Sequence, residues 1–195
     1  MNKIKFIILL STLFISNLVY AHEMSGGGGF ITGLTHPVLG LDHLLAMLSV
    51  GILSLQIGGR AIWMVPATFV LVMLIGGVLG MQEIALFSVE LGIAISVLVL
   101  GIAIAIDKKL SPLLAMLFVS FFAIFHGHAH GTEMPYLSSP VFYALGFVLS
   151  TACIHLVGVF LGYSAKSLNM GSQLLKFLGL LIAAIGVYLC YNTIF

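Results

Sequence analysis

Charge is what this sequence has least of. Of its 195 residues, 7% are Asp, Glu, Lys or Arg and 61% are hydrophobic, with a mean hydropathy of +1.24. Soluble domains carry charge on about a quarter of their residues, so the composition excludes a soluble fold. A net charge of +1 also offers no basic surface for nucleic acid. The composition therefore predicts an integral membrane protein.

Cysteine is scarce too. Cys153 and Cys190 are the only two, and both stand in apolar runs without a Cys-x-x-Cys partner. This argues against a thiolate metal site or a redox motif and favours two small buried residues. The sequence also lacks Walker, HExxH and GxSxG motifs. ATP-driven transport by this chain alone and two common hydrolase chemistries are therefore not indicated.

The first 21 residues have the pattern of a secretory signal peptide. Lys3 and Lys5 precede an apolar region at 6–19, and Ala21 provides a small residue at the expected cleavage point. The 14 residues of that region are short for a spanning helix, which needs about 20. We therefore expect cleavage rather than an uncleaved anchor, leaving a mature domain of residues 22–195.

Six further apolar stretches approach spanning length, at 36–57, 61–81, 84–106, 110–128, 139–163 and 172–194. Lipid offers the backbone no hydrogen-bond partners, so each is predicted to be a transmembrane helix. Gly76-xxx-Gly80 and Gly158-xxx-Gly162 predict close helix packing. The predicted fold class is an all-α membrane protein with six transmembrane helices after a cleaved signal peptide. Three helices per half would place the two halves in opposite orientations.

The basic residues predict the orientation of these helices. All seven precede the first helix or flank alternate connections, and so share one side: Lys3, Lys5, Arg60, Lys108, Lys109, Lys166 and Lys176. The positive-inside rule makes this side cytoplasmic. Both mature termini are then expected in the periplasm, with the domain in a bacterial inner membrane. The outer ends of the first and fourth helices should lie at one depth.

Those two outer ends carry histidine–acid clusters. The first contains His36, Asp42 and His43. On one continuous helix His36 and His43 would share a face, and Pro37 would suit its first turn. Ionisable groups are costly in membrane helices and indicate function. Imidazole with carboxylate suits a borderline divalent metal ion.

The second cluster contains His126, His128, His130 and Glu133. If the segment is helical, His126, His130 and Glu133 project from one side and His128 points elsewhere. The adjacent glycines, Gly127 and Gly131, are expected to loosen the end of the helix. The alternative for both clusters is a set of interfacial histidines bonded to backbone or lipid headgroups.

Three more ionisable residues are weaker candidates. Glu90, expected about two turns into the third helix, could neutralise an inward-moving cation or carry a proton. Its alternative is a protonated carboxyl bonded to a neighbouring helix. His155, in the fifth helix, could be an inner relay or a hydrogen-bonded core residue. His22, as a new N-terminus, could chelate metal through its amine and imidazole.

The motifs His36-x5-Asp42-His43 and Phe-His-Gly-x-Ala-His-Gly-x-Glu at 125–133 resemble those of the HupE/UreJ family of hydrogenase and urease accessory proteins. The resemblance covers the whole chain. It implies a permease for nickel, sometimes cobalt, that supplies metalloenzyme assembly. It also implies metal-related roles for His36, Asp42, His43, His126, His130 and Glu133.

The sequence as a whole thus predicts a secondary Ni²⁺ permease, not an enzyme, whose partners are the metal ion and the bilayer. No permanent cofactor is expected. The nitrogen and oxygen ligands suit Co²⁺ as well, and do not exclude Zn²⁺. One alternative is a membrane-embedded metal-dependent hydrolase, which would retain its metal. Another is a membrane metal sensor or chaperone, which would bind metal without flux.

Overall fold

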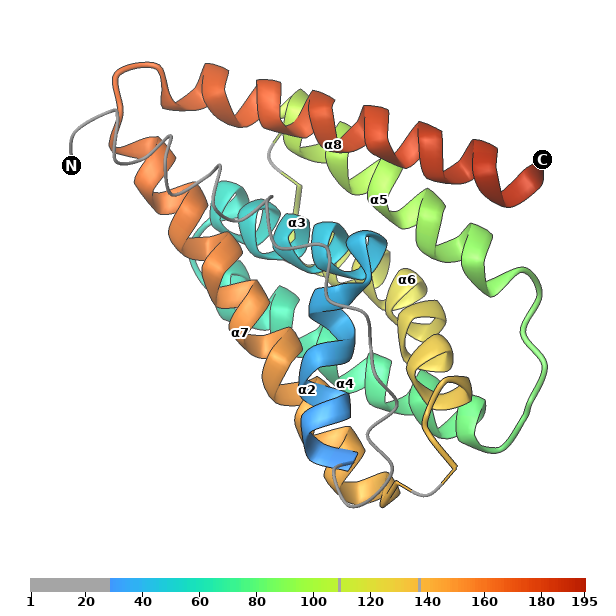
Figure 1. Cartoon of the computed structure of the whole chain (residues 1–195). Helices are drawn as coiled ribbons and strands as arrows, with labels where there is room; N and C mark the ends of the chain where they lie inside the picture. The colour runs from blue at the N-terminus through green and yellow to red at the C-terminus, as the bar shows by residue number, and fades with distance from the viewer. Residues whose placement is uncertain (1–28, 109, 137) are drawn as a thin grey trace.

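A computed structural model describes residues 29–108, 110–136 and 138–195. The predicted signal peptide and His22 lie outside the described residues. The described part is all-helical (Figure 1), and its helices are α2 (Gly29–Leu39), α3 (Leu41–Ile57), α4 (Ala61–Met81), α5 (Val89–Ile106), α6 (Pro112–Thr132), α7 (Pro140–Lys166) and α8 (Gly171–Ile194). The five helices from α4 to α8 are long and apolar enough to span a membrane. The predicted all-α membrane fold is confirmed.

The first predicted helix is not continuous, which corrects the expectation for 36–57. The chain bends by 79° between α2 and α3. Gly40 at the bend has extended backbone angles, φ −80° and ψ 112°, so the helical hydrogen-bond ladder is interrupted there. Glycine is a poor helix former, which makes the break inexpensive at this position. Pro37 lies in the last turn of α2, rather than in the first turn of a helix.

The bent pair nevertheless follows α7 along its length. At one end, α2 packs so closely on α7 that a Cβ at Gly33 would overlap the Tyr143 carbonyl. At the other end, the Lys166 ammonium donates to the carbonyl of Leu55 at 2.9 Å. Because α7 itself is long enough to span, this packing supports counting α2 and α3 together as one interrupted span. The described chain therefore has six spans when the bent pair counts as one.

Glycines bring the main helix pairs into backbone contact. A Cβ at Gly76 or Gly80 of α4 would overlap carbonyls of α6, and a Cβ at Gly158 of α7 would overlap the Leu48 carbonyl of α3. The predicted packing role of both small-xxx-small motifs is confirmed. Gly127 and Gly131 do the same from α6 towards α4, and α6 stays helical to Thr132. The expectation that they loosen the helix was wrong.

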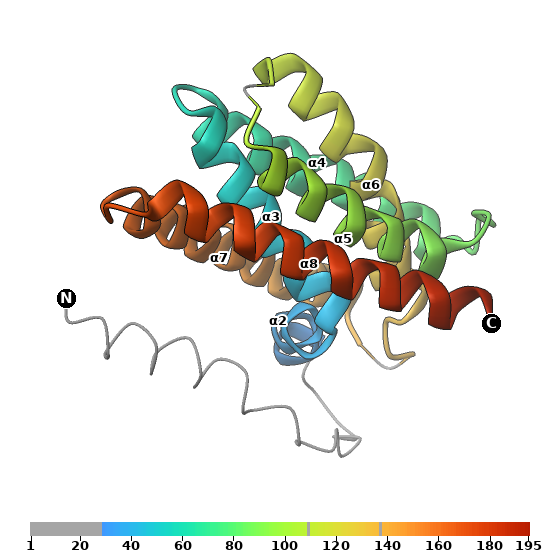
Figure 2. The ribbon, with the colours of Figure 1, turned by 90° about the horizontal axis from the view of Figure 1, so that it is seen from above.

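α5 and α8 form another close pair, lying side by side in both views (Figures 1 and 2).

Cys153 is exposed and Cys190 partly exposed, so the prediction of two buried cysteines was wrong. The reason is the solvent: lipid is as apolar as leucine, so an apolar run does not tell which helix face is buried.

The two ends of the bundle differ in chemistry. One end contains the histidine clusters. At the other, Asp107 accepts hydrogen bonds from Gln56 of α3 at 3.0 Å and Ser172 of α8 at 3.2 Å. The four described basic residues belong to this second end, in or beside its connections: Arg60, Lys108, Lys166 and Lys176. The predicted grouping of basic residues at one end is therefore present in the fold.

Candidate metal site

Four histidine rings from three helices meet at one end of the bundle. His130 of α6 lies 4.9 Å, between ring centroids, from both His36 of α2 and His43 of α3. His43 is also 4.9 Å from His126 of α6. The predicted meeting of the two segments is thus found. The bend at Gly40, rather than a shared helix face, brings His36 and His43 to within 6.0 Å.

Carboxylates orient two of these rings. The Nδ1 of His43 donates to Asp42 Oδ1 at 2.9 Å, which leaves its Nε2 with a lone pair. The Nε2 of His36 lies 2.8 Å from Glu133 Oε2, which leaves Nδ1 free in the same way. The hydrogen bond from His36 lowers the pKa of the Glu133 carboxyl against the opposing effect of burial. Glu133 is therefore ionised at neutral pH.

A serine orients a third ring. The hydroxyl of Ser96 donates to the Ile93 carbonyl at 2.6 Å, so its oxygen accepts from Nε2 of His126 at 2.9 Å. The lone pair of His126 is then on Nδ1. Sequence reasoning missed Ser96. The available signal was a hydroxyl in an otherwise apolar helix, which gains significance only beside a histidine from another helix.

The free nitrogens of the cluster are buried. His43 is 6% exposed, and His126 and His130 are 0% exposed. Nε2 of His43, Nδ1 of His126 and both nitrogens of His130 have no hydrogen-bond partner among the described residues. Each such atom costs about 1–3 kcal/mol when left unsatisfied. A metal ion is a natural partner for such lone pairs.

The rings do not enclose a finished metal site. No group of three or more His, Cys, Asp or Glu within the described residues is arranged to hold one ion. The three closest ring pairs instead meet edge to face. Chelation by three imidazoles would therefore require the side chains to rotate. The metal role of each predicted residue remains a prediction.

His128 points away from the cluster, in agreement with its predicted direction. Its Nε2 donates to the Ile84 carbonyl at 2.8 Å. Ile84 belongs to the connection between α4 and α5, so this bond fastens the connection to α6. The geometry gives His128 a structural contact.

Glu90 lies nearer the end of its helix than predicted. The segment before α5 contains Ser88 in the left-handed region, with φ 46°, and the helix begins at Val89 instead of 84. Glu90 is therefore exposed in the first turn. Its carboxylate interacts electrostatically with those of Glu133 and Asp42. Together the three acids place negative charge beside the histidine cluster.

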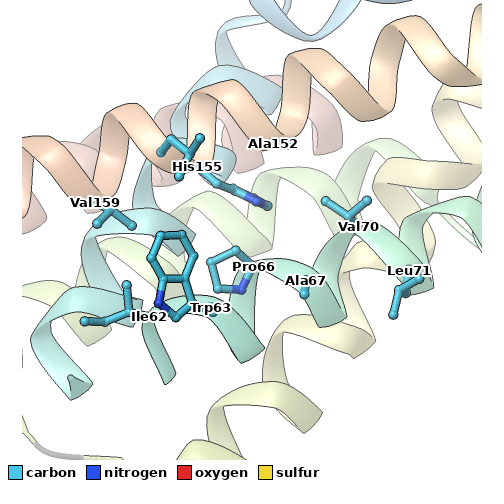
Figure 3. A pocket seen from close by; sticks show the side chains of 10 residues that line it. Ile62, Trp63, Pro66, Ala67, Val70, Leu71, Ala152, His155 and Val159 are labelled. Carbon is cyan, nitrogen blue, oxygen red and sulfur yellow. The ribbon is translucent and has the colours of Figure 1, made fainter. Parts of the chain in front are cut away.

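His155 lies outside the cluster, on α7, and is 2% exposed with no partner for either ring nitrogen among the described residues. Phe69 of α4 contacts both His126, at 5.5 Å between ring centroids, and His155, at 5.2 Å. A pocket of about 400 Å³ lies between α4 and α7. His155 lines it together with Trp63 and Pro66 (Figure 3). The described residues therefore do not supply the hydrogen bonds expected of a core histidine.

Buried aromatic rings complete the surroundings of the cluster, and sequence reasoning missed them. Phe147 stacks on His130 at 5.0 Å with an interplanar angle of 4°. The Tyr143 ring lies 6.4 Å from that of His36. Nothing in the sequence separates these aromatics from the many others in apolar runs, because their significance depends on the helix opposite.

The fold and site define a multi-pass membrane protein with a buried histidine–carboxylate cluster. The family model described as "HupE / UreJ protein" matches residues 10–189, and the chain belongs to this family. "Protein HupE" of Rhizobium leguminosarum bv. viciae is 42% identical over 150 residues, which cover 77% of this chain and 78% of that protein. No solved structure matches the chain significantly. The resemblance seen in the two motifs is thereby confirmed.

Proposed function

We propose that this protein is an inner-membrane permease that takes up Ni²⁺, with Co²⁺ also compatible, for assembly of a metalloenzyme such as a hydrogenase or urease. One observation carries the proposal. Buried imidazoles of α3 and α6 lie 4.9 Å apart between ring centroids and have ring nitrogens without a partner among the described residues. Asp42 and Ser96 hold two of these rings with the other nitrogen free. Such partners commonly orient histidines that bind metal.

The proposed pathway begins at the acidic groups. Glu90, Glu133 and Asp42 would raise the local concentration of a divalent cation. The ion would then exchange some of its water for imidazole nitrogen. Protons compete for the same lone pairs, so affinity should fall as pH falls through the histidine range. Because the histidine rings do not enclose a single point, they would bind the ion weakly enough to release it again. Conduction requires both binding and release.

Inward movement would pass Phe69 towards His155. These residues and His126 form a continuous series of ring contacts. With the basic end of the bundle in the cytoplasm, a divalent cation moving inward gains roughly 4.6 kcal/mol per 100 mV of membrane potential, twice the value for one charge. The potential could therefore drive uptake without a nucleotide-binding domain.

Two alternatives predict different metal behaviour. A metal-dependent hydrolase would retain its ion, and a sensor or chaperone would bind an ion without transporting it. Membership of the HupE/UreJ family supports the accessory role implied by the sequence motifs. Net flux of metal is therefore the decisive property.

Uptake of radioactive nickel tests the proposal directly. The protein would be expressed in cells lacking their own nickel transporters, with His36→Ala, Asp42→Ala and His130→Ala variants at equal membrane levels. We expect uptake by the wild type and a loss of about tenfold or more in the variants. Glu83→Gln is the matched control, since Glu83 is an exposed acid in the α4–α5 connection. Competition by Co²⁺ and Zn²⁺ would rank the ions.

The absence of uptake by a well-expressed, correctly oriented wild type would contradict the permease. Binding without flux would then favour a sensor or chaperone. A tightly retained ion that supports turnover of a substrate would favour the hydrolase.

A further inference from the structure

Tyr143 has a buried hydroxyl with no hydrogen-bond partner among the described residues. The residue lies in the first turns of α7 and is 0% exposed. Buried polar atoms in native proteins nearly always have a partner, so an exception requires an explanation. The aromatic ring of Tyr143 packs against that of Phe147, with 5.6 Å between the ring centroids. The packing does not explain the hydroxyl.

The position of Tyr143 links it to the histidine cluster. The close approach of α2 to α7 at Gly33 places His36, one turn further along α2, beside the Tyr143 ring at 6.4 Å and 67°. Tyr143 also contacts Phe147, which stacks on His130. The phenol therefore borders the cluster at His36 directly and at His130 through one intervening ring.

A phenol beside the cluster could interact with the water molecules of a hydrated cation. Water bound to a divalent metal ion is acidified and is a strong hydrogen-bond donor. The imidazole lone pairs of the cluster would be occupied by the metal itself. A neutral phenol oxygen accepts a hydrogen bond and does not add a charge to the site.

We propose that the Tyr143 hydroxyl accepts a hydrogen bond from a water ligand of the partly hydrated divalent cation bound at the histidine cluster. Tyr143 is then a positioning residue for that ion, in a role that rests on the proposed metal-uptake function. Direct ligation by a phenolate is disfavoured by charge. Tyr143 interacts electrostatically with the Glu133 carboxylate, so a second negative charge there would be repelled.

Tyr143→Phe tests this role because it removes the hydroxyl and keeps the ring. Ni²⁺ binding would be measured by isothermal titration of the full-length protein purified in detergent, together with its thermal unfolding. We expect the Kd for Ni²⁺ to rise about tenfold or more. The melting temperature should not fall, because the Tyr143 hydroxyl has no hydrogen-bond partner among the described residues. Tyr163→Phe is the matched control on the same helix, at a side chain that is 67% exposed.

Three results would overturn the role of Tyr143 and leave the proposed function standing. The first is an unchanged Kd in Tyr143→Phe while His130→Ala still abolishes binding. The second is an unchanged Kd with a lower melting temperature, which would make the hydroxyl structural. The third is a phenolate-to-metal charge-transfer band in the loaded wild type that the Phe variant lacks, which would make Tyr143 a direct ligand. A wild type that binds no Ni²⁺ would overturn the proposed function itself.

Discussion

At the scale of single residues, three of the four clustered histidines are each paired with a hydrogen-bond acceptor. His36, His43 and His126 each have one ring nitrogen beside an acceptor, and the acceptors are Glu133, Asp42 and Ser96. Such a partner selects the tautomer and leaves the other nitrogen free to bind. Neither nitrogen of His130 has a hydrogen-bond partner in the described part of the chain, and its ring is stacked on Phe147.

Glu133→Gln separates charge from hydrogen bonding at this site. The amide oxygen can still accept from His36, but the negative charge is lost. We expect the KM for Ni²⁺ uptake to rise about tenfold, the lower end of the effect of orienting partners. Glu83→Gln, an exposed acid in the α4–α5 connection, should leave KM unchanged. Equal effects of both substitutions would show that only the overall surface charge matters.

His128→Leu should lower the stability of the protein rather than its affinity for nickel. It removes the donor to the Ile84 carbonyl, and the net loss of one hydrogen bond costs about 0.5–1.5 kcal/mol of stability. We expect a lower melting temperature in detergent with little change in KM for nickel. Loss of nickel affinity at unchanged stability would contradict this structural role and place His128 among the ligands.

At the scale of elements, the bend between α2 and α3 creates the cluster. A straight helix would hold His36 and His43 two turns apart along one axis, whereas the 79° bend turns both rings towards α6. Gly40 leaves the space for this arrangement. A Cβ there would lie 3.0 Å from Asp42 Oδ1 and 3.2 Å from His43 Nδ1.

Gly40→Ala therefore tests the bend. The backbone φ of −80° accepts alanine, so the fold should persist. The new methyl group should displace the Asp42–His43 pair and weaken Ni²⁺ binding about tenfold in equilibrium titration. Gly77→Ala is the control, because its Cβ would meet only ordinary contacts at 3.6 Å. Wild-type affinity in Gly40→Ala would show that the pair does not depend on this space.

At the scale of the whole molecule, the helices pair in a regular order. The bent pair packs on α7, α4 on α6, and α5 on α8. Exchanging the first three spans with the last three maps the first two of these pairings onto each other and the α5–α8 pairing onto itself. This is the pattern expected when two halves of opposite orientation share a fold.

Orientation in the membrane can be tested with two exposed residues from opposite ends. Tyr136 lies in the connection between α6 and α7, and Lys108 in that between α5 and α6. In a background without Cys153 and Cys190, Tyr136→Cys should react with an impermeant thiol reagent on intact spheroplasts. Lys108→Cys should react only after permeabilisation, since basic connections face the cytoplasm. The reverse labelling would refute the proposed direction of uptake.

The local features of this chain were predictable because each depends on a few neighbouring residues. The span 61–81 matches α4 residue for residue. Length and hydropathy alone define such a span in lipid. The main errors in the predicted spans occurred where the backbone leaves the helix, at Gly40 and at Ser88. Hydropathy does not register a break of one or a few residues, so Glu90 was placed too deep.

The sequence by itself determined the membrane class, most of the spans and the two sets of candidate metal-binding side chains, since ionisable groups stand out in an apolar chain whatever its fold. Only the tertiary structure decided which atoms are available there. Ser96 and His126 are 30 residues apart, and their 2.9 Å contact leaves Nδ1 as the free nitrogen. The Tyr143 hydroxyl and the Phe147 ring likewise gain their significance from helices distant in sequence. The physical reason is that a hydrogen bond or ring contact depends on two partners, and the fold alone brings them together.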